Sequence, residues 1–577
     1  MKMVTHNTLY WILTLGVIGM IYLSALLSLP PSVFWSPDEG AKFIQMHSLL
    51  TDAGIAHPIA YGAAAQDPLF TFYPTAPIYP QPLWPRGVLN HWSNLFPLVS
   101  LPFFQLFGLR GLYVVPLLCA LLSVVAVSVL ARKMEPGAAT PGLLLAGLGT
   151  PLFFQSVLFL EHTLAGALGL GALLGGWAAV CTPPHRQSVY AVAMIACLIG
   201  LFILRDETVI FLAALTCTGL LLLGKGRTHT GLRAGLALLA FLILLAMVKA
   251  LGDTLGDSNR ASELIRNVTG AWAGLKDPVL WCALPTHLLH VFINDPLPFG
   301  VPLSQKWAVT GLAGLGLCAL SQMTGPRWQF PGWLLGAVLV SIPSLLGLCM
   351  SDRYRAVHGL LLSTPCLVLA WLPLPAGHKP TASRERFLVT LLPVYLVIYA
   401  LATWLFRRPS GGPEWGLRYA LLAYLLAAAV GAVAVTRFQQ TSRGWRRLAG
   451  LGLATLLVVM SCAYGVRGMI EVQVTKRDLQ AFEQEIHEAH CPLITDQWWL
   501  ASALAPAFVH TEFYTLNPHA TPDLWLAHIA NKTPAFLYVS YDTPPDPPKV
   551  PNGPKLILAQ HRRIQGMIFS RYSVEKP

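Results

Sequence analysis

Apolar stretches long enough to cross a lipid bilayer recur thirteen times along this chain of 577 residues. A helical span needs roughly 20 apolar residues. Because no water is present in hydrocarbon, each span must satisfy its own backbone polar groups, which favours helices. The sequence therefore predicts an all-α polytopic membrane protein with about 13 transmembrane helices. The predicted spans lie near 8–29, 111–131, 140–160, 163–181, 188–204, 208–224, 231–250, 308–323, 333–350, 358–374, 387–406, 419–436 and 448–465.

Composition supports a membrane class. Hydrophobic residues make up 54% of the chain and charged residues only 11%, which is more apolar surface than a soluble chain of this length could bury. The net charge of +12 would suggest nucleic acid in a soluble protein. Here much of the Lys and Arg lies in short loops between spans, where it sets orientation, so we expect membrane lipids as partners and no nucleic acid.

The basic loops predict the orientation of the bundle. They fall on one face if the N-terminus is cytoplasmic, as the positive-inside bias requires. The first apolar stretch is too long for a signal-peptide core and is expected to be retained. An odd number of spans then places the C-terminus outside. The basic residues of that face are Lys2, Arg132, Lys133, Arg186, Lys225, Arg227, Arg233, Arg327, Lys379, Arg384, Arg386 and those from Arg437 to Arg447.

Two domains are expected, a membrane domain over 1–465 and a small α/β extracytoplasmic domain over 466–577. The membrane domain has two long outer loops, 30–110 and 251–307, and the first should contain an amphipathic helix after Pro37. The apolar piece near 91–108 either lies in the membrane interface or crosses the membrane. A crossing would change the number of spans from odd to even, and with it the predicted side of the C-terminus.

The terminal domain shows a helical pattern from Lys476 to His490 and strand patterns over Ala535–Tyr541 and Lys555–Val574. A turn near Gln565-Gly566 divides the second pattern into a hairpin. The Pro-rich run from Pro544 to Pro554 predicts a stiff surface loop.

Two adjacent carboxylates, Asp38 and Glu39, follow the first span in a polar loop. Ser36-Pro37-Asp38-Glu39 is also a good helix start, with a Ser cap, a Pro in the first turn and a Glu positioned to close a capping box. That structural explanation accounts for Glu39 better than for Asp38, because adjacent helical residues point about 100° apart. Asp38 is therefore expected to face a cavity.

Glu161 and His162 lie between the third and fourth predicted spans, almost without a loop. The pair is explained either as a polar turn or as a site in which the carboxylate and imidazole orient one another or bind a divalent metal. Two residues do not identify an ion.

Arginines close or head several spans on the outer face, where positive charge is less expected. Each is explained either as a surface or snorkelling residue or as a ligand for phosphate, which the planar guanidinium binds well. Tyr and Trp beside them could serve as interface anchors. The motifs are Arg205-Asp206-Glu207, Asp352-Arg353-Tyr354-Arg355 and Glu414-Trp415-Gly416-Leu417-Arg418-Tyr419.

Taken together and in this order, these motifs resemble the C-type (GT-C) glycosyltransferases. The resemblance rests on an Asp-Glu pair in the first outer loop, a Glu-His pair that heads a span, an Arg-x-Glu that closes one and a Trp-Gly-x-Arg-Tyr entry to a late span. Within that superfamily the chain is similar to bacterial relatives of dolichyl-phosphate-mannose protein mannosyltransferases, including the aminoarabinose transferases of lipid A. The likeness covers most of the membrane region and implies the inner or plasma membrane of a bacterium.

The resemblance implies transfer of a sugar from a polyprenyl-phosphate-sugar donor to a glycan, lipid or protein acceptor at the outer face, with inversion. Asp38 is carried over as the general base that accepts the acceptor's proton, with Glu39 as the alternative carboxylate. Glu161 and His162 would position the acceptor or support Asp38. Charge on the departing phosphate would be stabilised by the cationic residues and their tyrosine neighbours. These are Lys42, Arg205, Arg353, Tyr354, Arg418 and Tyr419.

Several choices stay open at this level. A second catalytic acid in the loop 251–307 is not identified among Asp253, Asp257, Asp277 and Asp295, so no cofactor is certain and a divalent metal stays open. Cys282 and Cys491 are candidates for a disulfide. The alternative functions are a secondary transporter, an O-antigen ligase or polymerase, and a non-catalytic scaffold or sensor.

Overall fold

The computed structural model describes residues 2–51, 60–73, 93–205, 208–223, 278–293, 305–350, 359–373, 383–405, 417–516, 529, 532–541, 555–564 and 566–575. The chain forms two compact units. Unit 1 comprises Met1–Ser24, Pro116–Val157 and Glu161–Met469, and unit 2 comprises Ala25–Val115, Leu158–Leu160 and Ile470–Pro577. Of the terminal domain that the sequence predicts over 466–577, residues 470–577 are therefore grouped in unit 2 with the first long loop.

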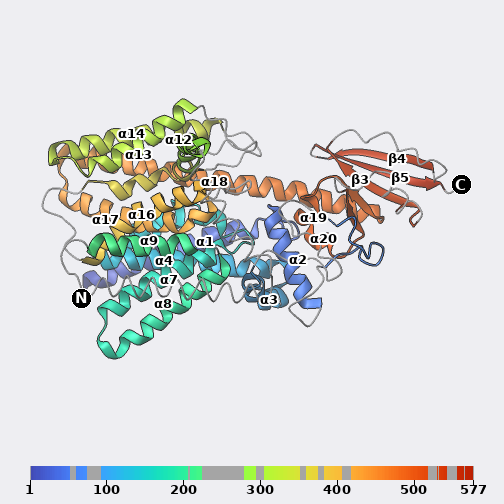
Figure 1. Ribbon diagram of the computed structural model, residues 1–577, viewed down its shortest axis with the longest axis horizontal. Coiled ribbons are helices and arrows are strands. Elements are labelled where there is room, and N and C mark those ends of the chain that lie inside the picture. Colours follow the sequence, from blue (N-terminus) through green and yellow to red (C-terminus); the bar gives the residue numbers. More distant parts are fainter. Residues whose placement is uncertain are drawn as a thin grey trace. The chain divides into compact units, whose positions relative to one another are not determined.

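Unit 1 is a bundle of helices that pack side by side (Figure 1). Its most buried long helix is α17. In α17, 89% of the apolar 18-residue stretch is buried, compared with 11% in the N-terminal helix α1. The helices are α1 (Lys2–Leu27), α4 (Val114–Met134), α5 (Ala139–Leu148), α6 (Leu152–Gln155), α7 (His162–Cys181), α8 (Pro184–Leu204), α9 (Thr208–Leu223), α12 (Pro278–Phe292), α13 (Gln305–Ser321), α14 (Pro326–Met350), α15 (Leu360–Ser363), α16 (Ser383–Leu405), α17 (Leu421–Thr441) and the first part of α18 (Gly444–Ala489). Short 3-10 turns are η2 (Pro136–Ala138), η3 (Pro365–Trp371) and η4 (Arg418–Ala420).

Close helix contacts in this unit use small residues, as expected where lipid removes the hydrophobic driving force between helices. A Cβ atom on Gly314 of α13 would lie 2.6 Å from the carbonyl oxygen of Gly336 on α14, and the reverse substitution meets the same distance. Only glycine at both positions allows these two backbones to approach so closely.

Eight helices in the described part of the chain are long and apolar enough to cross a membrane, so the prediction of an integral, mostly helical membrane protein is confirmed, while the count of thirteen is not. The eight stretches are Thr8–Leu27, Leu95–Met134, His162–Cys181, His185–Leu204, Arg327–Cys349, Glu385–Leu405, Leu421–Thr441 and Gly444–Ala489. The predicted spans at 208–224 and 308–323 are the shorter helices α9 and α13. The predicted span at 231–250 lies outside the described residues.

Two predicted spans are interrupted by proline. In place of one helix over 140–160, α5 ends at Leu148, the chain turns, and α6 follows. In place of one helix over 358–374, α15 ends at Ser363 and η3 begins at Pro365. Pro151 and Pro365 explain both breaks, because proline lacks an N–H and disfavours helical geometry in the residue before it.

Other expectations need correction at their boundaries. The predicted span 448–465 and the predicted helix Lys476 to His490 are parts of one 46-residue helix, α18. The loop predicted over 251–307 contains α12 in its described part. The apolar piece near 91–108 forms α3 (Leu95–Phe107), whose 13 residues span about 20 Å, less than a bilayer core of about 30 Å.

Unit 2 places the predicted amphipathic helix, α2 (Pro37–Thr51), against the two short helices α19 (Leu500–Ala503) and α20 (Ala505–Phe508) and against α3. A Cβ atom on Gly40 would lie 1.6 Å from the carbonyl oxygen of Ser502, so α2 can pack on α19 at this distance only with glycine there. The 3-10 turn η1 (Gly108–Tyr113) and the last part of α18 belong to the same unit.

A five-stranded sheet completes unit 2, in the order β2-β1-β3-β5-β4 (Figure 1). The strands are β1 (Leu493–Thr495), β2 (Phe513–Thr515), β3 (Ala535–Ser540), β4 (Lys555–Ile564) and β5 (Met567–Glu575). The predicted strand at 535–541 and the predicted hairpin are confirmed, with Gly566 at φ 85° in the turn. Strands β1 and β2, which pair in parallel, were too short to be predicted. The predicted loop from Pro544 to Pro554 lies outside the described residues.

Candidate functional site

The first carboxylate pair lies at the start of α2 in unit 2, and the predicted capping box is present. The Ser36 backbone N–H donates to Glu39 Oε2 at 2.9 Å, and the Glu39 backbone N–H donates to Ser36 Oγ at 3.4 Å. These bonds satisfy two of the N–H groups that a helix start leaves without an intrahelical partner. The helix therefore begins where the sequence predicts it.

Glu39 is fully buried, and its carboxylate also holds a segment far along the chain. The Phe159 backbone N–H donates to Glu39 Oε1 at 2.8 Å. Burial raises the pKa of the Glu39 carboxyl, while the charge of Lys476 and the bonds from backbone N–H groups oppose that rise. The fully buried Lys476 donates from Nζ to the Tyr113 hydroxyl at 2.7 Å and lies 4.6 Å from the Tyr113 ring centroid. These contacts give Glu39 a structural role that anchors α2.

Asp38 occupies a different face of the same helical turn. It is half-buried, in contrast to its neighbour. Lys42, one turn further along α2, shares the face of Asp38, because residues four apart on a helix are neighbours. Lys42 is buried, with 3% of its surface exposed. The capping bonds of Glu39 agree with the sequence-based expectation, while the cavity expected at Asp38 and its catalytic role stay predictions.

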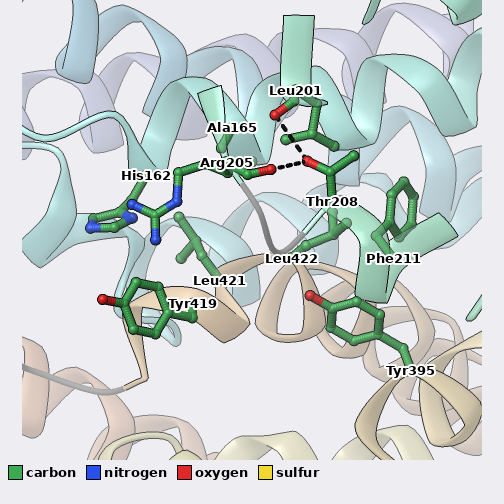
Figure 2. Close-up of a pocket in the computed structure, with 11 residues that line it drawn as sticks. His162, Ala165, Leu201, Arg205, Thr208, Phe211, Tyr395, Tyr419, Leu421 and Leu422 are labelled. Atoms are coloured by element: carbon green, nitrogen blue, oxygen red, sulfur yellow. Dashed lines mark hydrogen bonds between the residues drawn. The ribbon is translucent and has the colours of Figure 1, made fainter. Parts of the chain in front are cut away.

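The second cluster lies in unit 1, where His162, Arg205 and Tyr419 come together from three parts of the chain (Figure 2) and Glu161 joins them through an ion pair. Arg205 Nη1 forms an ion pair with Glu161 Oε1, and the two side chains are 14% and 4% exposed. The Arg205 guanidinium carbon lies 4.8 Å from the Tyr419 ring centroid. The His162 ring meets the same tyrosine edge to face, with the centroids 6.2 Å apart.

Each residue of this cluster stands at the end of a helix. His162 is the first residue of α7 and Glu161 directly precedes it. Arg205 caps the end of α8 in an extended conformation, and its N–H still donates to the Leu201 carbonyl at 2.9 Å. Thr208, which begins α9, donates from Oγ1 to the carbonyl oxygens of Leu201 and Arg205 at 2.9 and 2.7 Å (Figure 2). These two hydrogen bonds fix the turn between α8 and α9, and so fix the backbone of Arg205.

A buried hydroxyl network lies at the entry to α17, close in sequence to Tyr419. The Leu417 backbone N–H donates to the Tyr424 hydroxyl at 3.0 Å, and that hydroxyl lies 3.3 Å from Ser363 Oγ. Tyr424 is fully buried. The network links the break between α15 and η3 to Leu417, two residues before Tyr419.

A pocket opens beside the cluster, with an empty volume of about 400 Å³ that includes space open to solvent. His162, Arg205 and Tyr419 lie at one end of the view, while Phe211 and Tyr395 lie at the other (Figure 2). Among the described residues that line it, Arg205 is the one arginine or lysine, and none is a carboxylate. Its lining residues are His162, Ala165, Gly166, Leu201, Arg205, Thr208, Phe211, Tyr395, Tyr419, Leu421 and Leu422. The pocket therefore offers one guanidinium to an anion and a largely apolar wall to hydrocarbon.

The structure brings together only part of the predicted set. Asp38, Glu39 and Lys42 belong to unit 2, while Glu161, His162, Arg205 and Tyr419 belong to unit 1, so their meeting at one site stays a prediction. Arg418 lies in η4, and the side chain is outside the described part. Arg353, Tyr354 and the candidate second acids Asp253, Asp257, Asp277 and Asp295 lie outside the described residues.

Sequence reasoning missed Lys476, Thr208 and Tyr424. A signal for Lys476 exists in hindsight, because it lies on one helical stripe with the buried Val472 and Leu479. A lysine on an apolar stripe indicates a buried partner. For Tyr424, a tyrosine inside a predicted span, the sequence carries no comparable signal.

Within the described ranges, no group of three or more His, Cys, Asp or Glu residues is arranged to hold a metal ion. The divalent metal that the sequence left open therefore gains no support from these residues. Cys282 and Cys491 are both free thiols, so the disulfide considered from the sequence is not formed.

No protein-family model matches this chain, and no curated protein matches it either. Solved structures similar to it include ArnT from Cupriavidus metallidurans in the apo state, with 13% sequence identity, a TM-score of 0.42 and coverage of 98% of both chains. The same enzyme bound to undecaprenyl phosphate matches with 13% identity and a TM-score of 0.42, over 97% of this chain and 98% of that one.

Proposed function

We propose that this protein is a membrane glycosyltransferase that moves a sugar from a polyprenyl-phosphate donor to an acceptor hydroxyl, with inversion at the anomeric carbon. The observation that carries the proposal is the pocket of unit 1, which is lined by the Arg205 guanidinium and by a largely apolar wall. A phosphate attached to a long hydrocarbon chain has the same two-part chemistry. Arginine suits the phosphate because its planar fork of donors matches phosphate oxygens.

The geometry around Arg205 suits a leaving group that gains charge. When the bond between the anomeric carbon and the phosphate oxygen breaks, the departing phosphate takes both electrons of that bond. A guanidinium already fixed by Glu161 and Tyr419 needs little reorganisation to stabilise that charge. The partly buried site strengthens the interaction, because low-dielectric surroundings screen less than water.

Asp38 is assigned as the general base. A hydroxyl acceptor is a poor nucleophile until its proton is removed. As its oxygen bonds to the anomeric carbon, the proton passes to the Asp38 carboxylate, and the polyprenyl phosphate leaves from the opposite face. Asp38 is half-buried, and the bonds that Glu39 makes to backbone N–H groups support a structural role for that neighbour.

The position of the pocket favours a transferase over the transporter alternative. Charged residues that couple transport are expected near the middle of the membrane in broken helices. Arg205 and Glu161 instead lie where α8 ends and where α7 begins. A site at the ends of helices can admit both a lipid-borne donor and a water-borne or lipid-borne acceptor.

The proposal is tested with Asp38→Asn. We expect the variant to reach the same abundance in membranes and to lose transfer by about 10²- to 10⁴-fold, the usual contribution of a general base. Transfer is measured by mass spectrometry of envelope glycolipids and glycoproteins from cells with the parent protein, with the variant and without either. A sugar absent without the protein identifies donor and acceptor together. Equal transfer by Asp38→Asn and the parent would refute the assignment.

A further inference from the structure

The sheet of unit 2 has a topological switch point. Strand β1 lies between β2 and β3 and is parallel to both. The chain leaves β1 towards β2 on one side and later returns as β3 on the other side. At such a point the connections diverge, and ligands of open α/β sheets bind in the crevice outside the carboxyl ends of the strands. The carboxyl ends of β1 and β3 are therefore the place to search for a second site.

The residues that leave β1 carry both aromatic and polar side chains. Asp496 is exposed, and Gln497, Trp498 and Trp499 are half-buried. Gln497 Nε2 donates to Asp496 Oδ1 at 2.8 Å. The loop is well fixed, because the Gln497 backbone N–H donates to Thr495 Oγ1 at 3.0 Å and the Leu500 N–H donates to the Gln497 carbonyl at 3.1 Å.

Tyr541 leaves β3 beside this loop. Its side chain is 49% exposed, and its ring centroid lies 6.2 Å from that of Trp499, with the planes 32° apart. Thr495 Oγ1 donates to the Val539 carbonyl at 2.8 Å, which ties the two strand ends together. Two aromatic rings and a carboxylate–amide pair therefore meet at the switch point.

We propose that Asp496, Gln497, Trp499 and Tyr541 form a carbohydrate-binding site for a pyranose ring. A pyranose presents a flat face of C–H groups, which packs on the electron-rich face of Trp or Tyr, and a rim of hydroxyls that both donate and accept. A carboxylate accepts several hydrogen bonds, and an amide offers donors and an acceptor side by side. Partial exposure of both rings is required for such stacking, and a tyrosine that served only the core would be buried.

This site shares no residue with the set assigned to the transfer reaction. It would hold the glycan portion of a molecule at the terminal domain, whether or not that molecule is the acceptor. Its test therefore uses direct binding and does not use turnover, so failure here and failure of the proposed transferase are distinguishable.

The experiment uses the purified full-length protein in lipid nanodiscs. Saturation-transfer NMR and calorimetry measure binding of a panel of pyranose oligosaccharides, with choline as a probe of cation binding. We expect Trp499→Ala and Tyr541→Ala each to weaken glycan binding about tenfold, and Tyr541→Phe to retain it, because the ring supplies the contact. Leu558→Ala, at a residue of the edge strand β4 that is 45% exposed, is the matched control and should bind as the parent does.

Three results would overturn the proposal. The parent protein could bind none of the sugars, the two alanine variants could bind as tightly as the Leu558→Ala control, or choline could bind through the same rings in place of sugar.

Discussion

Two of the described arginines of unit 1, Arg205 and Arg437, pair with glutamate, and they lie near opposite ends of α17. Arg205 contacts Tyr419 just before that helix begins, and Arg437 lies in its last turns. At about 1.5 Å of rise per residue, roughly 27 Å of helix separate Tyr419 from Arg437. The same chemical pair therefore appears twice in one bundle, in different surroundings.

Arg437 is directed entirely at protein groups. Its Nε donates to Glu135 Oε2 at 3.1 Å, its Nη2 donates to the Met134 carbonyl at 3.1 Å and to Glu385 Oε2 at 3.3 Å, and its Nη1 also bonds Glu385. These contacts join the end of α4, the start of α16 and the end of α17. The fork of one guanidinium thereby connects three helices.

Arg205 differs in what surrounds it. It pairs with Glu161, stacks on an aromatic ring and lines a pocket. Arg437 is not among the residues that line that pocket. The comparison indicates that an arginine in a membrane bundle is structural when several helices supply its acceptors, and is available for a ligand when it also borders open space.

The largest expected effect is on thermal stability, and it distinguishes Arg437 from Arg205. Arg437→Met leaves two partly buried carboxylates without their cation, and breaking such a set costs about 3–5 kcal/mol. We expect a clear fall in the midpoint of thermal unfolding of the purified protein, with transfer per folded molecule unchanged. Replacing Glu385 by Gln in the same variant should restore part of the loss. An unchanged unfolding midpoint would show that the triple contact does not hold the helices together.

The second effect concerns ligand binding, for which we expect Arg205 to matter more than Arg437. Arg205→Met should reduce binding of a long-chain polyprenyl phosphate and reduce transfer about 10²- to 10³-fold, as the loss of a donor to developing charge does. Glu161→Gln in the same variant removes the uncompensated carboxylate and serves as the control for stability. Binding is measured by native mass spectrometry in nanodiscs beside Arg437→Met. Equal binding by the two arginine variants would remove the functional distinction between the two sites.

The sequence predicted most of the regular helices because membrane spans follow from length and apolar composition. Helices α7 and α8 coincide closely with the predicted 163–181 and 188–204. The start of α2 followed from Ser36 and Glu39, since a capping box is a local signal. Local chemistry and composition were sufficient for these elements.

The rest depends on tertiary contacts. Arg437 was counted as an orientation charge, although it holds three helices together, because pairing across the bundle leaves no local pattern. Lys476 was assigned to a separate soluble helix because the sequence around it is polar, whereas α18 continues without a break and buries it. The grouping of Arg205 with Tyr419 joins residues far apart in the chain, which spacing alone cannot bring together.

The smallest expected effect tests whether Tyr424 positions the pocket residue Tyr419. Tyr424→Phe removes one hydroxyl that binds the Leu417 N–H and lies near Ser363, which costs about 1 kcal/mol of stability. Tyr22→Phe is the matched control, because the buried Tyr22 hydroxyl donates to the Gly147 carbonyl at 2.7 Å and neither residue is among those that line the pocket. Both variants should lower the unfolding midpoint by a similar amount, and only Tyr424→Phe should also weaken polyprenyl-phosphate binding, by a few fold. If the two variants lose binding equally, the hydroxyl network stabilises the bundle without setting the ring beneath Arg205.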